Sequence, residues 1–380
     1  MRSYNVGIIG YGGFGKFLHH WWSKLESVKI TAIADAKLQD DHSGEYKVYQ
    51  NGLDLLNDPE VDIVSIVTPP ALHAGMACAA MRAGKHVLLE KPVAITNEQA
   101  EQIKQVQQET GKVVLVNHMI RYNPLIKAIQ ELSLSGKLGE LRHAVVNNYA
   151  QDSLLPREHW FWNRELSGGI FVEHGVHFID IVNALTTQTF TDVCGYWHDR
   201  NETQRDQVAA LVRYDKGLIV SHYHSFSGPG FFESTTIQLN FDLAKIKIEG
   251  WMPMKGTIRA LVNDSSKDQF NILPGWQQEE ITGINTLHDQ SRPEGWGDVV
   301  AADPETLIAG KSYQVNQMIS GTFEIPKTKG EVYGQCVQGT LLDLIAKAED
   351  PNHHMSITLE NAATSLKIAL LASSKYSTHQ

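Results

Sequence analysis

The first 117 residues alternate short apolar runs with stretches of helical character. The runs lie at residues 5–10, 28–35, 61–68, 86–91 and 112–117, and most are close to continuously apolar. Strands that are buried on both faces have this composition, because neither side of the sheet meets water. The pattern therefore predicts five parallel strands wrapped by helices, which is a doubly wound α/β domain.

Start and stop signals bound the helices between these runs. A Pro-Pro pair at residues 69–70 opens one helix, and Gly84 closes it. Thr96 and Gln99 have the spacing of a capping box ahead of a polar helix that ends at Gly111. We expect this polar helix on the outside of the sheet.

After residue 122 the pattern changes to one helix followed by runs with strand-like composition. The tripeptide Asp-Lys-Gly at residues 215–217 separates two of these runs and has hairpin chemistry. We therefore predict an α+β second domain with an open-faced, mainly antiparallel sheet. The helix is predicted at residues 125–133 and the runs at 141–149, 208–214, 218–224, 235–241 and 245–248.

These observations divide the chain into a first domain at residues 1–122 and a second domain at residues 123–380. Residues 263–311 are polar and weakly periodic, so they are assigned no structure. An amphipathic helix is predicted at about residues 359–376, where it could pack back on the first domain.

Composition narrows the class of protein. A chain of 380 residues exceeds one typical hydrophobic core, which supports two domains. Lys and Arg total 33 against 43 Asp and Glu, and no dense basic run appears, so nucleic acid and anionic membranes are not expected partners. The three cysteines lie far apart, and no leader or membrane-length apolar run is present, so we predict a cytoplasmic protein.

The first strand leads directly into the hexapeptide GYGGFG at residues 10–15, which matches the pattern G-x-G-x-x-G. This chemistry needs Gly10 for a tight turn, Gly12 for close approach of a pyrophosphate and Gly15 for helix packing. The N-terminus of the following helix then binds the anion. The predicted cofactor contacts in this loop are Gly10, Gly12, Gly13, Phe14 and Gly15.

Asp35 stands at the end of the second run, twenty positions beyond Gly15. A carboxylate there can accept hydrogen bonds from the adenosine ribose hydroxyls and repel a 2′-phosphate, which favours NAD over NADP. Lys37 lies two residues further on and could soften that repulsion, so use of NADP stays open.

Lys91 stands at the end of the fourth run, and ligands of open α/β sheets gather at the carboxyl ends of the strands. A lysine there could hydrogen-bond a substrate hydroxyl and stabilise the alkoxide that forms as hydride leaves. The alternative is a solvated lysine after a strand, which is common. The residues alone leave both interpretations open.

A predicted helix at residues 170–185 is largely apolar but carries Glu173, His177 and Asp180 on one face. Burying such groups without partners is costly, so they form either a satisfied internal network or the wall of a site. His177 could take a proton from an alcohol near neutral pH, and Glu173 could orient it. A metal site that includes His174 lacks an evident fourth ligand, so no metal is predicted.

Other aromatic and histidine residues are less informative. The run His-Trp-Phe-Trp at residues 159–162 could stack on an apolar sugar face or could belong to the core. Trp162 is the candidate substrate contact in this run. His222 and His224 alternate on a predicted strand and are assigned no role.

Beyond the glycine loop, the chain resembles a known family in the runs VSIVTPPALHAGMACAAMRAGKHVLLEKPVA and GGIFVEHGVHFID. The family is that of glucose-fructose oxidoreductase, inositol dehydrogenase and the MocA proteins. The likeness covers the first domain and continues to about residue 184. It implies an NAD(P)-dependent oxidoreductase of sugars, polyols or their derivatives, forming a homodimer or homotetramer through the open-faced sheet.

The resemblance also implies roles for particular residues. The lysine of the family's EKP motif falls on Lys91, and the family's histidine falls on His177. An aspartate that precedes this histidine by four residues in inositol-dehydrogenase-like members is Glu173 here, which moves the charge outward by one methylene and weakens inference about the substrate. Further family-like positions are Thr68, Pro69, His73 and Glu90 around the cofactor, Arg121, Asn123 and Pro124 at the domain junction, and Asp180.

These observations combine into one hypothesis. A sugar, polyol or sugar derivative docks between the domains, His177 removes its hydroxyl proton, Lys91 stabilises the oxyanion, and hydride passes to the nicotinamide. Arg121, Trp162 and Glu173 are further predicted substrate contacts. Two alternatives stay open, namely an NAD-dependent glycosidase of the same superfamily and a non-catalytic dinucleotide-dependent sensor, which would need neither the lysine nor the histidine.

Overall fold

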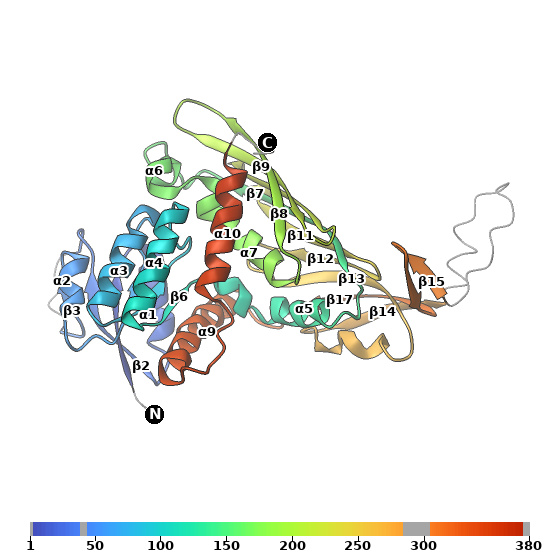
Figure 1. Cartoon of the computed structure of the whole chain (residues 1–380), viewed down its shortest axis with the longest axis horizontal. Helices are drawn as coiled ribbons and strands as arrows, with labels where there is room; N and C mark the ends of the chain where they lie inside the picture. Colours follow the sequence, from blue (N-terminus) through green and yellow to red (C-terminus); the bar gives the residue numbers. More distant parts are fainter. Residues whose placement is uncertain (1–2, 39–43, 284–304, 375–380) are drawn as a thin grey trace.

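The N-terminal part of the chain forms a six-stranded parallel sheet in the order β3-β2-β1-β4-β5-β6 (Figure 1). The computed structural model describes residues 3–38, 44–283 and 305–374. All five predicted strands are present, and the sheet has β3 as an additional edge strand. The strands are β1 (Tyr4–Ile9), β2 (Val28–Ala34), β3 (Lys47–Tyr49), β4 (Ile63–Ile66), β5 (His86–Leu89) and β6 (Val114–Val116).

Helices cover both faces of this sheet and begin and end close to the predicted signals. Thr96 accepts a hydrogen bond from the backbone of Gln99, while the Gln99 side chain accepts one from Ile95, so only half of the predicted capping box forms. Gly111 adopts a left-handed conformation with φ 65° and closes that helix. The elements are α1 (Gly13–Trp22), α2 (Gly52–Leu56), η1 (Pro70–Leu72), α3 (His73–Arg82), α4 (Asn97–Thr110) and η2 (Met119–Tyr122).

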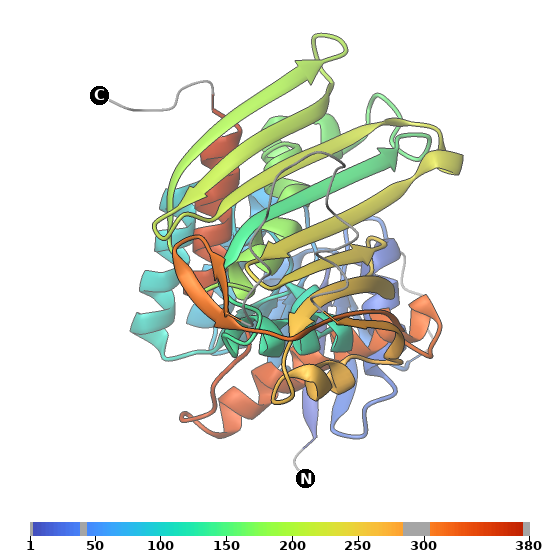
Figure 2. The ribbon, with the colours of Figure 1, turned by 90° about the vertical axis from the view of Figure 1, so that its right-hand side faces the viewer.

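The second sheet has nine strands in the order β14-β17-β13-β12-β11-β7-β10-β9-β8 (Figure 2). Neighbouring strands are antiparallel except β7 and β10, so the predicted mainly antiparallel sheet is confirmed. A two-stranded ribbon adjoins it. The strands are β7 (Leu141–Gln151), β8 (Phe190–Asp199), β9 (Arg205–Tyr214), β10 (Ile219–Gly228), β11 (Ser234–Phe241), β12 (Ala244–Glu249), β13 (Lys255–Val262), β14 (Gln277–Gly283), β17 (Gln317–Glu324), and, in the ribbon, β15 (Glu305–Ile308) and β16 (Lys311–Gln314).

Helices lie against one face of this sheet, and its opposite face is exposed (Figure 2). The exposed face presents Tyr149, Tyr196 and Leu211, whose exposed fractions are 47%, 69% and 53%. Such a face suits contact with a second subunit, and the expected homo-oligomer stays a prediction. The helical elements are α5 (Pro124–Leu134), η3 (Trp160–Trp162), α6 (Arg164–Ser167), a π-helical turn (Phe171–Gly175), α7 (Val176–Ala184), η5 (Gly230–Phe232), η6 (Lys267–Ile272), α9 (Lys329–Glu349) and α10 (Leu359–Ala372).

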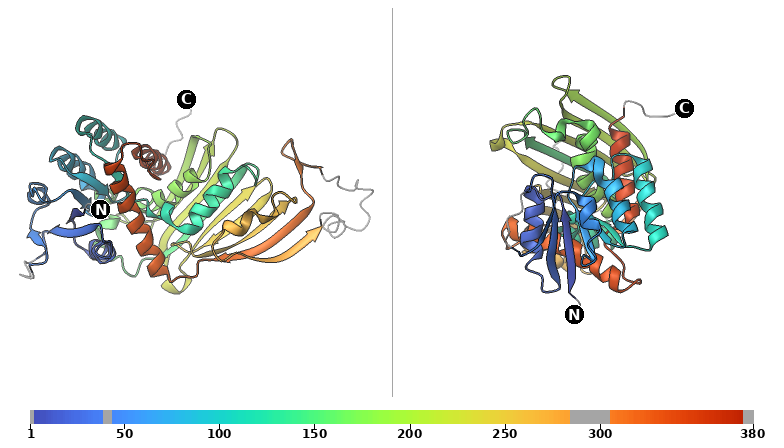
Figure 3. Two further views of the ribbon diagram at one scale, coloured as in Figure 1. Left: turned by 90° about the horizontal axis from the view of Figure 1, so that it is seen from below. Right: turned by 90° about the vertical axis from the view of Figure 1, so that its left-hand side faces the viewer.

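Two helices near the end of the chain also contact the N-terminal domain. In Figure 3, left, the orange-red α9 runs between the blue strands and the green and yellow sheet. The Trp22 indole donates to the carbonyl of Val337 at 2.9 Å, and the Gln338 side chain donates to the carbonyl of Trp21 at 2.8 Å. α10 packs on α7 and β8 and also contacts α4. The domain boundary at residue 122 stays a prediction. α9 comes after this boundary in the chain, but it packs on β5 and β6 of the N-terminal sheet.

No helix within the described ranges combines the length and apolarity that a membrane span needs, and this includes the 21-residue α9.

The contact between α9 and α1 depends on a glycine. A Cβ atom on Gly334 would lie 2.1 Å from the Trp21 ring, whereas one on Gly330 of the same helix would have no atom within 4 Å. We predict that Gly334→Ala lowers the free energy of unfolding by about 1–3 kcal/mol through overpacking. The matched control Gly330→Ala should leave stability unchanged or raise it. Thermal and urea unfolding measure both, and equal stability of the two variants would contradict this account of the contact.

Candidate active site

The glycine loop leaves open backbone surface at the N-terminus of α1. Gly10 has φ 94°, and a Cβ on it would lie 2.5 Å from the carbonyl oxygen of Val67. A Cβ on Gly15 would lie 2.3 Å from the carbonyl of Gly10, so both positions require glycine. Gly12 and Gly13 face open space, and neither a side-chain cap nor a first-turn acid occupies the helix terminus. This surface fits the pyrophosphate of a dinucleotide.

Asp35 follows β2 and holds the glycine loop. Its Oδ2 accepts a hydrogen bond from the backbone of Tyr11 at 2.8 Å, and its Oδ1 accepts one from the backbone of Lys37 at 2.9 Å. Each carboxylate oxygen can accept more than one hydrogen bond. Asp35 therefore retains the capacity to accept the ribose hydroxyls of NAD.

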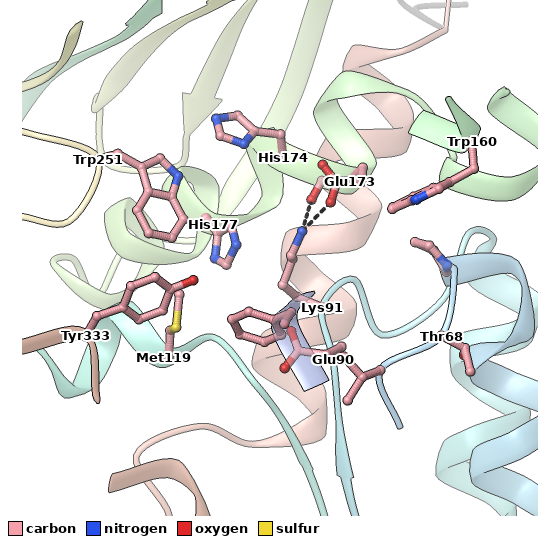
Figure 4. Close-up of a pocket in the computed structure, with 13 residues that line it drawn as sticks. Thr68, Glu90, Lys91, Met119, Trp160, Glu173, His174, His177, Trp251 and Tyr333 are labelled. Atoms are coloured by element: carbon pink, nitrogen blue, oxygen red, sulfur yellow. Dashed lines mark hydrogen bonds and ion pairs between the residues drawn. The ribbon is translucent and has the colours of Figure 1, made fainter. Parts of the chain in front are cut away.

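A cavity of about 380 Å³ lies between the two sheets, at the carboxyl ends of β4 and β5 (Figure 4). Both parts of the chain contribute to its wall, and α9 contributes as well. This is the position at which open parallel sheets bind ligands. The lining residues are Phe14, Val67, Thr68, Pro70, Glu90, Lys91, Met119, Trp160, Glu173, His174, His177, Trp251 and Tyr333.

Lys91 and Glu173 join the two sides of this cavity. The Lys91 ammonium donates to Oε1 of Glu173 at 2.5 Å and to the backbone carbonyl of Glu173 at 2.7 Å. Each side chain is only 15% exposed. Burial alone would raise the pKa of Glu173, but the charge of Lys91 and its hydrogen bond hold the pKa below its ordinary value. Glu173 is therefore ionised and paired.

The predicted helix at residues 170–185 is a π-helical turn followed by α7. Glu173 lies within the turn and His177 lies just after it, and both side chains reach the cavity. Burial, with Lys91 and the neighbouring imidazoles, holds the pKa of His177 well below 6.5. His177 is therefore neutral near pH 7, which is the form that can accept a proton.

Outside the glycine loop and Asp35, the predicted site residues Trp162, Arg121, Pro69 and His73 do not line the cavity. Trp162 is buried and donates its indole N–H to the carbonyl of Leu155 at 3.0 Å, whereas Trp160, two residues earlier, lines the cavity. Arg121 pairs with Asp180 through two hydrogen bonds of 2.6 and 2.8 Å. Pro69 stands at the N-cap position of η1, next to the lining residues Thr68 and Pro70.

His73 supports the cavity from behind. Its ring nitrogens lie 2.6 Å from the carbonyl of Pro92 and 2.9 Å from the carbonyl of Thr68. Complete burial lowers the pKa of His73 to about 4, so the ring is neutral and donates to one carbonyl at a time. His73 thus ties together the loops that follow β4 and β5.

Sequence reasoning missed several lining residues. Met119 belongs to the domain junction, Trp251 follows β12, and Tyr333 lies on α9. The Trp251 ring lies 5.9 Å from that of His177 and 5.4 Å from that of Tyr333. No spacing in the sequence links these positions to the helix of His177. His174 also lines the cavity, and the described residues contain no group of three or more ligands placed to hold a metal ion.

Comparison with known proteins agrees with this arrangement. A family model described as an oxidoreductase family with an NAD-binding Rossmann fold matches residues 4–118, and a GFO/IDH/MocA C-terminal domain model matches residues 126–242. The chain is 26% identical over 330 residues to 1-carboxy-3-chloro-3,4-dihydroxycyclohexa-1,5-diene dehydrogenase of Comamonas testosteroni, covering 84% of this chain and 81% of the relative. It is also 26% identical over 281 residues to scyllo-inositol 2-dehydrogenase (NAD(+)) of Bacillus subtilis, covering 71% and 80%. The chain spans about half the length of several other curated relatives.

Among solved structures, an oxidoreductase domain protein from Kribbella flavida superposes with a TM-score of 0.74 at 18% identity, covering 98% of this chain and 96% of that one. This likeness shows the shared fold. The two family models and the curated relatives establish that the chain belongs to the GFO/IDH/MocA family of NAD(P)-dependent oxidoreductases.

Proposed function

We propose that the protein transfers hydride between NAD and a neutral cyclic polyol or sugar at a CH–OH carbon. One observation carries the proposal: Lys91 of the N-terminal domain and Glu173 and His177 of the second domain line one cavity beside the cofactor loop. When bound, the nicotinamide supplies the hydride acceptor or donor. The task of the protein is then to orient the hydroxyl and to handle its proton and charge.

Each polar group has a distinct part in this proposal. Neutral His177 accepts the proton of the substrate hydroxyl. Lys91 has three N–H donors, of which Glu173 occupies two, so one remains for the developing oxyanion. The ion pair also fixes the direction of that donor. Glu173 thereby acts as the residue that positions Lys91.

Aromatic rings supply the apolar part of the site. Trp160, Trp251 and Tyr333 line the cavity, and such rings pack against the C–H faces of cyclic polyols. The names of the two curated relatives above specify scyllo-inositol and a carboxylated, chlorinated dihydroxycyclohexadiene, which are both six-membered hydroxylated rings. Because the second ring carries a carboxyl group, the names bear on the ring and not on its charge. These names support a cyclic substrate here.

The charges in the cavity favour a neutral substrate. Lys91 is the one basic side chain other than histidine among the lining residues described, and it is already paired with Glu173. Burial lowers the pKa of His174 to about 4, so neither lining histidine carries a charge at pH 7. A carboxylate or phosphate in this cavity would therefore lack a free cation.

Lys91→Ala should lower kcat by about 10²- to 10⁴-fold while NAD affinity stays within about twofold, because the oxyanion loses its donor. Reduced-cofactor absorbance measures turnover across a panel of inositols and sugars, and fluorescence measures NAD and NADP binding. Lys104→Ala on the outer helix α4 is the control and should keep wild-type turnover. Unchanged turnover in Lys91→Ala would reject its role. Substrate consumption without net NADH would instead favour the glycosidase, and tight cofactor binding without turnover the sensor.

Because the described lining residues offer no free cation, we predict that the enzyme discriminates between neutral and anionic members of that panel. For the preferred neutral substrate, kcat/KM should exceed that of the corresponding sugar acid or sugar phosphate by at least about 100-fold, since an unpaired buried charge costs several kcal/mol. Steady-state kinetics with each neutral and anionic pair measures the ratio. Equal or greater efficiency with the anionic member would rule out the neutral-substrate proposal.

Glu90 gives the site a pH-dependent effect on stability. It is buried and accepts a hydrogen bond from Asn117 at 2.5 Å, and burial raises its pKa from 4.5 to about 7 despite Asn117 and Lys91. Because the folded state binds this proton more tightly than the unfolded state, stability falls as pH rises from about 4.5 to 7.

Glu90→Gln should remove this effect. Relative to wild type, the variant should gain up to about 3 kcal/mol of unfolding free energy between pH 5 and pH 8, which corresponds to the pKa shift. Urea unfolding at the two pH values measures the change. The exposed Glu279→Gln is the control and should follow wild type. A parallel pH dependence of Glu90→Gln and wild type would contradict a raised pKa for Glu90.

A further inference from the structure

Two buried histidines beside the cavity have ring nitrogens without a hydrogen-bond partner. His118 is 1% exposed, and neither of its ring nitrogens has a partner among the described residues. His177 is 4% exposed, and its Nδ1 likewise has none. An unsatisfied buried polar group costs about 1–3 kcal/mol, so two such groups side by side need an explanation.

The two rings lie against each other, and a carboxylate lies behind them. Their centroids are 6.2 Å apart, and the ring planes are perpendicular. His118 Nδ1 lies 3.9 Å from Oδ2 of Asp180, one helical turn beyond His177 on α7. His118 comes from the segment between β6 and η2, so the contact crosses from the first part of the chain to the second.

The proposed chemistry requires a particular tautomer of His177. A neutral imidazole that accepts a proton at Nε2 must carry its own hydrogen on Nδ1. The tautomer of a catalytic histidine is set by the partner of its other nitrogen. Because Nδ1 of His177 is buried, that partner must be a neighbouring protein group or a water held by one. The His118 ring lies beside that of His177, and its nitrogens make no hydrogen bond to the described residues, so it can supply this partner.

We propose that His118 is a positioning residue for His177. Its Nδ1–H points to Asp180, and its Nε2 accepts a hydrogen bond from Nδ1–H of His177, directly or through one bridging water. This leaves His177 Nε2 free to take the hydroxyl proton of the substrate. The catalytic part of this inference rests on the proposed function, whereas the tautomer of His177 does not.

The proton and electron balance is simple. The substrate carbon loses a hydride to NAD and is oxidised to the carbonyl, while the hydroxyl O–H bond breaks and its proton passes to His177 Nε2. His118 keeps its own proton and stabilises the imidazolium through the hydrogen bond. Asp180 assists at longer range because Arg121 and Ser365 already bind its oxygens.

The charges around His177 explain why such support matters. Burial disfavours protonation of His177 most strongly, and the positive charge of Lys91 adds to this effect. The Asp180 carboxylate lies behind His118, where Arg121 balances most of its charge. A neutral acceptor at Nδ1 therefore offsets part of the cost of forming the imidazolium.

Three variants test the catalytic part. His118→Phe should lower kcat by about 10- to 100-fold with KM within twofold, and should move the acid limb of the kcat profile to lower pH. His118→Gln, whose amide oxygen can replace Nε2 as acceptor, should recover much of the loss. His222→Phe is the matched control, because His222 is a buried and unpartnered histidine that does not line the cavity. Wild-type kcat and pH profile in His118→Phe, or equal losses in all three variants together with lowered Tm, would overturn the proposal.

A spectroscopic test is independent of turnover. ¹⁵N-histidine NMR at pH 7, with the His177 signals assigned through His177→Asn, should show His177 with its hydrogen on Nδ1 in wild type and in His118→Gln. The population should shift toward Nε2–H in His118→Phe. An Nε2–H tautomer in wild type would reject the positioning role. The expected tautomer in a protein that turns over no polyol would reject the proposed function while the contact itself stands.

Discussion

The buried ion pair between Arg121 and Asp180 holds α7, the helix that carries His177, against the segment that follows the first sheet. Arg121 lies in η2, the short helix that follows the last strand of the first sheet, and Asp180 lies on α7. Both residues are at most 7% exposed. Arg121 also donates to the carbonyl of Ser356, and Ser365 on α10 donates to Asp180, so three separate segments meet here. Removing one partner of such a pair leaves a buried charge and typically costs about 3–5 kcal/mol. Because His177 lies one turn before Asp180, the same pair sets its distance from Lys91.

Much of the fold follows from the pattern of apolar and polar residues along the chain. The elements that this pattern does not predict were missed for physical reasons. The five predicted runs of the first sheet are mostly apolar and mostly buried, so they are predicted directly. β3 (Lys47–Tyr49) has three residues at the sheet edge, and β8 (Phe190–Asp199) is a largely exposed edge strand, so neither has a distinct apolar pattern. No helix was predicted at α9 (Lys329–Glu349), although the capping box of Thr328 and Glu331 that begins it is visible in the sequence.

The site divides in the same way. The positions of Lys91, Glu173 and His177 at one cavity could be predicted because each belongs to a local pattern, a strand end or a polar stripe on an apolar helix. Their roles came from the family resemblance and stay predictions. Trp251 and Tyr333 reach the cavity only through tertiary packing, far along the chain from the other lining residues. Composition identified the aromatic run at 159–162, but which of its indoles faces the cavity depends on the short η3 turn. The π-helical turn was not predicted either, since apolar periodicity does not distinguish it from an α-helix.

The return of α9 to the first sheet means that the unit which binds the cofactor is discontinuous in the chain. A chimera that exchanged only residues 1–122 between relatives would place the Trp21 and Trp22 of one protein against the α9 of another, where Gly334 leaves no room for a differently shaped side chain. A chimera with a single crossover point would therefore lose stability at this contact. Residues 1–122 and α9 would have to be exchanged together. Because Tyr333 lies on α9, such an exchange would also transfer one of the side chains that line the cavity.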